Sequence, residues 1–325
     1  MAAQVFIHKQ MKKIYIKSLS LITLVMSCVS MFGQQDAQYT QYMYNPQVIN
    51  PAYVGSRDVL SVVGLHRSQW VGVDGAPRTS TLSVNSPIGL TKKVGLGISA
   101  INDEIGPVDE NYLSVDFSYS IDITQKSKLN FGLKGTAQIF NVDFSKLDIF
   151  DYSDNLYAND LDNDINPNVG AGAFYYSEDF YVGLSVPNIL QTEHFDIAAS
   201  ESSSSFTATQ DRINYYLLAG YVFDVSDSVL FKPATMVKVV DGSPLQLDVS
   251  ANFLINEKLT LGAAYRWSAA FSFLAGFQVS DSMMLGFGYD RETTDIQEYT
   301  SGSYEVMLRF ELFRKYTRML TPRFF

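Results

Sequence analysis

Residues 113–122 have the sequence LSVDFSYSID, in which apolar and polar side chains alternate without a break. The odd-numbered residues of this stretch are apolar or aromatic, and the even-numbered residues are Ser or Asp. The same alternation recurs at 129–139, 245–255 and 304–312. A period of two is typical of a β-strand that turns one face toward an apolar environment and the other toward water.

Two features favour a membrane barrel over a soluble β-sandwich or propeller. The alternating stretches are about ten residues long, which is the length of a tilted membrane-spanning strand, whereas soluble strands usually have about five or six residues. Charged residues also occupy the middle of the polar faces, as a water-filled lumen allows. We therefore predict an all-β fold: a transmembrane, antiparallel β-barrel of the outer-membrane type.

The pattern predicts about fourteen strands, an even number, as in bacterial single-chain barrels. They lie near 58–70, 77–87, 92–102, 111–123, 127–141, 167–177, 179–190, 212–224, 228–240, 243–255, 257–268, 269–279, 281–291 and 301–313. Even-numbered strands are followed by links of two or three residues, such as Ser226-Asp227, while longer links, notably 142–166 and 191–211, follow odd-numbered ones. Since periplasmic turns are short and extracellular loops long, we predict a periplasmic N-terminus and extracellular long loops.

Composition excludes several functions. The chain of 325 residues has 34 Asp and Glu against 24 Lys and Arg, which argues against a nucleic-acid partner because phosphate binding requires clustered cations. Its single cysteine, Cys28, excludes an internal disulfide and any zinc site built on several thiolates. No segment after the N-terminal region approaches the 18 apolar residues of a membrane helix. We expect no cofactor.

Residues 1–33 are predicted to be a signal peptide. Lys12, Lys13 and Lys17 precede an apolar run, and small residues place cleavage before Gln34. Residues 1–10 precede this pattern, and Met11 is the more natural start. Lipidation at Cys28 is the alternative to ordinary cleavage. Cleavage removes four Lys and no acid, which leaves 20 basic and 34 acidic residues, a net charge of −14, and no cysteine.

Three further parts follow the signal peptide. Residues 34–57 contain the pairs Asn45-Pro46 and Asn50-Pro51, which interrupt helix and strand, so this segment is predicted to be a plug in the lumen or else a periplasmic tail. Residues 58–313 form the predicted barrel. Residues 314–325 form a basic C-terminal tail that could dock an acidic partner.

Candidate site residues are sparse. The polar faces supply possible lumen charges, which we expect mainly to rigidify and hydrate the barrel: Asp116, Lys134, Asp248, Arg266, Glu305 and Arg309. His66 and Ser68 share one strand face and could form a catalytic pair, but no nucleophile motif surrounds them, so a hydrogen-bonded rim histidine is favoured. The spacing of Asp160, Asp162 and Asp164 is similar to a calcium loop, but Ile165 replaces its glycine, so a solvated acidic loop is favoured.

A series of short motifs runs through the mature chain in a fixed order. The motifs are Gln34-Gln35-Asp36, Asn50-Pro51-Ala52-Tyr53-Val54-Gly55-Ser56, Arg67-Ser68-Gln69-Trp70, Gly75-Ala76-Pro77-Arg78-Thr79, Val94-Gly95-Leu96-Gly97, Phe180-Tyr181-Val182-Gly183-Leu184-Ser185-Val186-Pro187-Asn188, Gly220-Tyr221, Gly288-Tyr289-Asp290 and Pro322-Arg323-Phe324-Phe325. In this order and spacing, the motifs resemble the PorP/SprF family of outer-membrane proteins of the type IX secretion system, and the resemblance covers essentially the whole mature chain.

This resemblance implies a non-enzymatic component of a protein secretion and gliding apparatus. Its expected partners are outer-membrane lipid, periplasmic components of the machinery and large secreted adhesins held at the cell surface. Asn50, Pro51, Ala52 and Tyr53 are the expected plug or partner-binding residues. The alternative is a transporter of hydrophobic small molecules, because barrels of the fatty-acid-uptake type are similar in strand number and in carrying an Asn-Pro-Ala plug.

Overall fold

The computed structural model describes residues 37–146, 161–191, 193–197, 206–210 and 212–312. The predicted signal peptide with Cys28, most of the acidic loop and the basic C-terminal tail lie outside these residues. Within the described ranges, no helix has both the length and the apolar character needed to cross a membrane.

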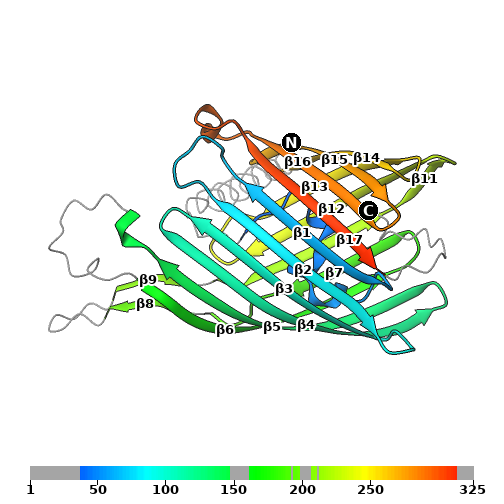
Figure 1. Cartoon of the computed structure of the whole chain (residues 1–325), viewed down its shortest axis with the longest axis horizontal. Helices are drawn as coiled ribbons and strands as arrows, with labels where there is room; N and C mark the ends of the chain where they lie inside the picture. Colours follow the sequence, from blue (N-terminus) through cyan, green and yellow to red (C-terminus); the bar gives the residue numbers. More distant parts are fainter. Residues whose placement is uncertain (1–36, 147–160, 192, 198–205, 211, 313–325) are drawn as a thin grey trace, which may run out of the picture.

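The fold is a closed antiparallel β-barrel of fourteen strands, which confirms the predicted class and strand number (Figure 1). The strands are β1 (Leu60–Ser68), β2 (Arg78–Ile88), β3 (Val94–Ile105), β4 (Val108–Thr124), β5 (Ser127–Val142), β6 (Leu161–Tyr176), β7 (Phe180–Val186), β10 (Asn214–Tyr221), β12 (Val229–Val240), β13 (Gln246–Ile255), β14 (Leu259–Arg266), β15 (Ala270–Ser280), β16 (Met283–Glu292) and β17 (Ser303–Leu312). The short β11 (Phe223–Ser226) continues β10. Pairing of β1 with β17, and of β10 with both β7 and β12, closes the barrel.

Strand alternation sorts the side chains between the outside and the lumen. On β4, Val115 is 61% exposed on the outer face, while its neighbour Asp116 is fully buried in the lumen. The register pairs Asp116 with Lys134 of β5, so that opposite charges face each other across the strand pair. A one-residue slip would turn every apolar side chain inward, and the apolar surroundings of the barrel therefore select this register.

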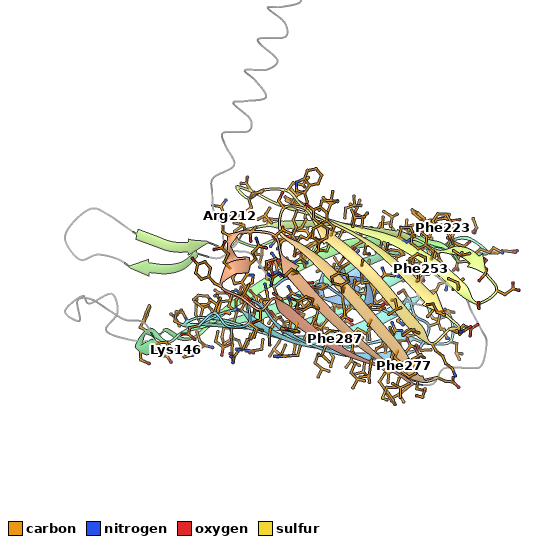
Figure 2. All side chains as sticks on the ribbon, turned by 90° about the horizontal axis from the view of Figure 1, so that it is seen from above. Lys146, Arg212, Phe223, Phe253, Phe277 and Phe287 are labelled. Carbon is orange, nitrogen blue, oxygen red and sulfur yellow. The ribbon has the colours of Figure 1, made fainter. Side chains whose placement is uncertain are left out.

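Aromatic side chains gather near both ends of the outer apolar surface. At one end, a series of ring contacts with centroid distances of 4.5–6.4 Å links Tyr175, Phe180, Tyr221, Phe223, Phe231 and Phe253. At the other end, Tyr265 contacts Phe271 at 4.6 Å and Tyr289 contacts Tyr304 at 5.2 Å. Figure 2 shows labelled phenylalanines on the outside of the barrel. Such aromatic girdles mark the two membrane–water interfaces of an outer-membrane barrel.

The two ends of the barrel differ in their connections. The short-turn end carries links of two to five residues, among them 89–93, 125–126, 177–179 and 281–282. The long-loop end carries, among others, the links 69–77, 187–213 and 293–302. The second of these contains a separate hairpin, β8 (Glu193–Ile197) with β9 (Phe206–Gln210), that projects from this end (Figure 1).

One wall of the barrel is taller than predicted. β4, β5 and β6 have 17, 16 and 16 residues, whereas β1 and β14 have 9 and 8. β6 begins at Leu161, six residues before the predicted start, because its pairing with β5 continues past the apolar zone. The residues added on this wall are largely polar, so membrane-strand alternation alone did not identify them.

Candidate functional site

The lumen contains the segment 37–59, which we call the plug. It forms three single-turn 3₁₀ helices: η1 (Tyr42–Tyr44), η2 (Pro46–Val48) and η3 (Pro51–Tyr53). Proline occupies the first position of η2 and η3, where its missing N–H costs no hydrogen bond. The side chain of Asn50 accepts a hydrogen bond from the N–H of Ala52 at 3.0 Å and so caps η3. All residues from 39 to 56 are buried.

The plug spans the lumen from end to end. Near the long-loop end, Arg266, the last residue of β14, donates to Gln38 Oε1 at 2.9 Å. At the short-turn end, Arg57 forms an ion pair with Glu311, close to the end of β17. The described chain therefore starts near the long-loop end, runs through the lumen and enters β1 at the short-turn end.

A buried ion cluster holds the start of the plug. Arg67 lies 2.7 Å from Asp290 Oδ2 and 3.4 Å from Glu305 Oε2. The two oxygens of Glu305 accept the backbone N–H groups of Thr40 and Gln41 at 2.9 and 2.8 Å, and the Thr40 hydroxyl donates to Asp290 at 2.6 Å. The single guanidinium faces two carboxylates, and the plug supplies further donors. Plug and wall therefore complete one network here.

A second cluster holds the middle of the plug. Asp116 forms an ion pair with Lys134 at 3.3 Å and accepts a hydrogen bond from the side chain of Gln47 at 3.0 Å. Lys134 also donates to the backbone oxygens of Gln47 and Val48 at 3.3 and 3.4 Å. Asn85 donates to Gln47 Oε1 at 2.9 Å. The two predicted lumen charges therefore bind the plug as well as each other.

The predicted plug or partner-binding residues lie in the half of the plug nearer to the short-turn end. They are Asn50, Pro51, Ala52 and Tyr53. Asn50 Nδ2 donates to the backbone oxygens of Ala173 and Leu184 at 3.2 and 3.5 Å. Pro51 and Ala52 form the turn of η3, and Asn130 donates to Ala52 O at 3.1 Å. The ring of Tyr53 packs edge-on against Phe174 with a centroid distance of 5.6 Å. All four residues therefore contact the barrel wall or neighbouring plug residues, and within the described structure they are buried.

Glycines in the wall leave room for the turn of η3. A Cβ at Gly132 would overlap the backbone of Pro51 and Ala52, and one at Gly172 would overlap the side-chain oxygen of Asn50. Gly95, Gly97 and Gly286 likewise face Val54, Gln47 and Gln41 at distances that leave no room for a Cβ. These residues were not among the predicted site residues. Inward-facing glycines on otherwise regular strands are the signal that could have revealed them.

The other predicted lumen charges are also in the interior. Asp248 and Arg266 form an ion pair at 2.9 Å. Arg309 lies over the ring of Tyr44 at 5.9 Å and donates to the sulfur of Met284 at 3.1 Å. Arg67 also belongs to the site, although it was not among the predicted lumen charges. It follows His66 on β1, so strand alternation places its side chain on the opposite, inward face.

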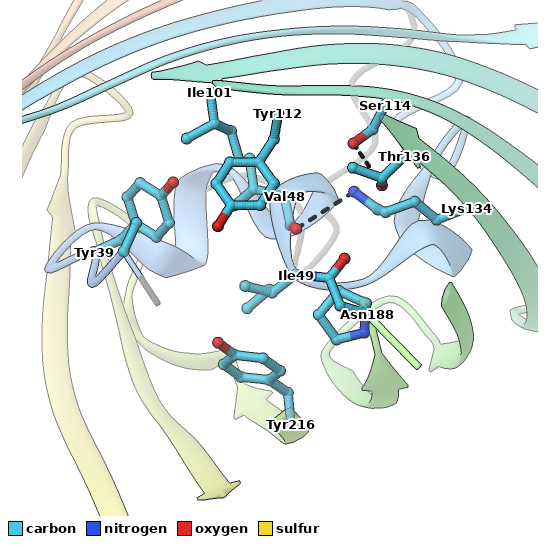
Figure 3. Close-up of a pocket in the computed structure, with 12 residues that line it drawn as sticks. Tyr39, Val48, Ile49, Ile101, Tyr112, Ser114, Lys134, Thr136, Asn188 and Tyr216 are labelled. Atoms are coloured by element: carbon cyan, nitrogen blue, oxygen red, sulfur yellow. Dashed lines mark hydrogen bonds between the residues drawn. The ribbon is translucent and has the colours of Figure 1, made fainter. Parts of the chain in front are cut away.

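A small cavity remains between the plug and the wall at the side of the long-loop end (Figure 3). Its volume is about 50 Å³, and Tyr39, Ile49, Tyr112, Lys134 and Tyr216 are among its lining residues. Binding sites for drug-sized ligands usually have about 300–1,000 Å³. The cavity has room for a few water molecules but not for a lipid-like substrate.

His66 lies on the outer face, near the long-loop rim. Its ring nitrogens are 2.9 Å from the Ser80 hydroxyl and 3.2 Å from the Ser68 hydroxyl, beside a rim cavity of about 550 Å³. A hydroxyl rather than a carboxylate therefore orients the ring, as in a hydrogen-bonded rim histidine. Of the suspected calcium loop, Asp160 lies outside the described residues, while residues 162 and 164 belong to β6. The described part of the chain contains no group of side chains arranged to hold a metal ion.

These features define a class: an outer-membrane β-barrel whose lumen holds a segment that precedes its first strand. The family model of the type IX secretion system membrane protein PorP/SprF matches residues 31–310. The chain belongs to this family, as its motifs suggested, and is a membrane component of the type IX secretion system.

Several solved barrels are similar in structure. The CymD monoaromatic hydrocarbon channel is 10% identical, with 85% of this chain and 94% of that chain covered and a TM-score of 0.48. The Acinetobacter baumannii outer membrane protein Omp33 is 8% identical (78% and 98% covered, TM-score 0.46), and a Pseudomonas aeruginosa FadL homologue is 11% identical (87% and 95% covered, TM-score 0.43). Likenesses of this degree carry no information about function. Among curated proteins, none matches the sequence.

Proposed function

We propose that this protein is a non-enzymatic binding component of the type IX secretion and gliding machinery. In this role the barrel holds other proteins at the outer membrane: periplasmic components of the machinery, a large secreted adhesin, or both. The plug inside the lumen is the observation that carries the proposal. It is bound to the wall from Gln38 to Arg57, and residues 39–56 are all buried. The cavity beside it, of about 50 Å³, has no room for a hydrophobic small molecule, which favours a binding platform over the alternative, a transporter of such molecules.

Co-purification from native outer membranes tests this function. The tagged full-length protein is extracted in mild detergent, and the associated proteins and lipids are identified by mass spectrometry. We expect periplasmic secretion components or a secreted adhesin at amounts comparable to the barrel itself. A matched purification of an unrelated tagged barrel from the same cells gives the background. Recovery of the barrel with a stoichiometric apolar small molecule, and with no protein above this background, would contradict the proposal and favour the transporter.

The proposed orientation has the short turns in the periplasm and the long loops outside, which is the usual arrangement of such barrels. With this orientation, the start of the plug opens to the outer surface. Since Cys28 lies in the predicted signal peptide, a cysteine introduced into the barrel is the only one in the mature chain.

Labelling of whole cells with a membrane-impermeant maleimide tests the orientation. Lys146→Cys is expected to react, because Lys146 is 58% exposed beyond the long-loop end of β5. Lys126→Cys, at a residue 74% exposed in the short turn between β4 and β5, is expected to react only after the cells are broken. The reverse pattern would show that the barrel is inserted the other way.

A further inference from the structure

The lumen wall contacts the main chain of the plug as a peptide-binding groove contacts its ligand. Wall side chains bond to backbone groups along the whole plug. The pairs are Arg266 with Tyr39 O, Glu305 with the N–H of Thr40 and of Gln41, Lys134 with Gln47 O and Val48 O, Ser185 with Ile49 O, Asn130 with Ala52 O, Ser118 with Val54 O, and Asn85 with the N–H of Gly55. Main-chain groups are common to every polypeptide, so these contacts do not depend on most of the plug's side chains.

The wall adds a few positions at which side chains are recognised. Asp290 accepts from the Thr40 hydroxyl, Asp116 accepts from the Gln47 amide, and the backbone of β6 and β7 accepts from the Asn50 amide. Glycines at 132 and 172 bring the wall backbone close to the plug at Asn50, Pro51 and Ala52. The groove therefore fits an irregular segment with hydroxyl and amide side chains and proline turns.

The plug does not satisfy this groove completely. Within the described residues, the side-chain amide of Gln41 and Nδ2 of Asn45 are buried without hydrogen-bond partners. On the wall, the same is true of Asn130 Oδ1, Asn252 Oδ1 and Arg309 Nη1. Buried polar groups without partners oppose binding. A segment that pairs these groups would bind better than the plug.

The plug is also connected to the barrel at one end of the lumen. Its chain continues into β1 at the short-turn end, whereas Ala37 and Tyr39 lie beside the small cavity at the long-loop side (Figure 3). The start of the plug is therefore the part where an incoming chain could replace it without meeting the covalent connection to β1.

We propose that the lumen is a polypeptide-binding groove and that the plug is its internal, replaceable ligand. The occupant that replaces the plug is a segment of a partner protein with amide and hydroxyl side chains, which enters from the long-loop mouth. The identity of this occupant as a partner of the secretion machinery rests on the proposed function, whereas the groove itself does not.

Exchange of a cut plug tests the groove. A protease site inserted between Asp58 and Val59 allows the full-length, folded protein to be cut, after which the plug is held by non-covalent contacts alone. A fluorescent synthetic peptide with residues 37–58 is then added. We expect it to enter the cut barrel, to be competed by the unlabelled peptide, and to be excluded when its residues are scrambled. In the cut Glu305→Gln variant, a neutral amide replaces the carboxylate that holds Thr40 and Gln41. Exchange of the plug for the peptide is expected to be at least tenfold faster in this variant.

Two outcomes would overturn the inference. The first is no uptake by either cut barrel while both still show the folded, heat-sensitive band on gels. The second is equal uptake of native and scrambled peptides. A photo-reactive amino acid at Tyr112, in the mouth, is expected to cross-link a co-purifying partner, whereas one at Tyr119, on the outer face near the short-turn end, is not. Partners that co-purify but cross-link only at Tyr119 would contradict the groove and leave the proposed function standing.

Discussion

Arg67→Ala is expected to lower the free energy of unfolding of the barrel by about 3–5 kcal/mol, the usual effect of removing one partner from a buried ion pair. Arg67 is the only cation within ion-pair distance of Asp290 and Glu305 among the described residues. Without it, two buried carboxylates face each other across Thr40, and the guanidinium bond to the Thr40 hydroxyl at 2.6 Å is lost as well. Equilibrium unfolding with a denaturant in detergent or lipid vesicles measures the change.

Arg291→Ala is the matched control for this experiment. Arg291 is the neighbour of Asp290 on β16, but it is exposed on the outer face. Substitutions at exposed positions usually change stability by no more than about 0.5 kcal/mol. Equal stabilities of the two variants would show that the cluster does not hold the barrel and plug together. The free energy of unfolding of Arg67→Lys is expected to lie between those of the wild type and Arg67→Ala. The ammonium keeps the positive charge, but it cannot bond to Asp290, Glu305 and Thr40 with the fixed fork of a guanidinium.

The barrel could be predicted from the sequence because each strand has lipid on one face and the polar lumen on the other. Alternation in β4, β5, β13 and β17 reports lipid on one side and a polar interior on the other, and the short links report the turns. The extension of β6 and the β8–β9 hairpin show this contrast only weakly in their sequence, so the pattern predicts links there.

The site was only partly predictable, for a different physical reason. Alternation places Asp116, Lys134 and Glu305 inside, but it does not say which residues they contact, because their main partners lie up to 265 positions away in the chain. The plug was expected from its Asn-Pro pairs, yet its direction through the lumen follows from contacts such as those of Gln38 with Arg266 and Arg57 with Glu311. Such contacts between distant residues leave no periodic pattern in a single sequence.

The wall glycines depend both on strand alternation and on contacts with the distant plug. Gly132 and Gly172 occupy inward positions where strand alternation predicts polar side chains, so each looks like a local weakness of its strand. In the structure they are places where the plug lies directly against the wall. The same residue thus lowers strand propensity and makes the site possible, and only the presence of the plug explains it.

Gly132→Ala is expected to displace the η3 turn and to open the barrel to ions. The new Cβ would overlap backbone atoms of Pro51 and Ala52, which cannot rotate away as a flexible side chain can. The nearby bond from Asn130 to Ala52 O would be lost with the displaced turn, and overpacking of this kind costs about 1–3 kcal/mol. Planar-bilayer recordings are expected to show open-channel steps that the wild type lacks, and the plug is expected to become accessible to protease.

Gly135→Ala is a matched control, because it adds the same methyl group to the same strand at an outward position with no atom within 4 Å. Identical recordings from the two alanine variants would mean that the contact of η3 with Gly132 does not keep the lumen closed to ions.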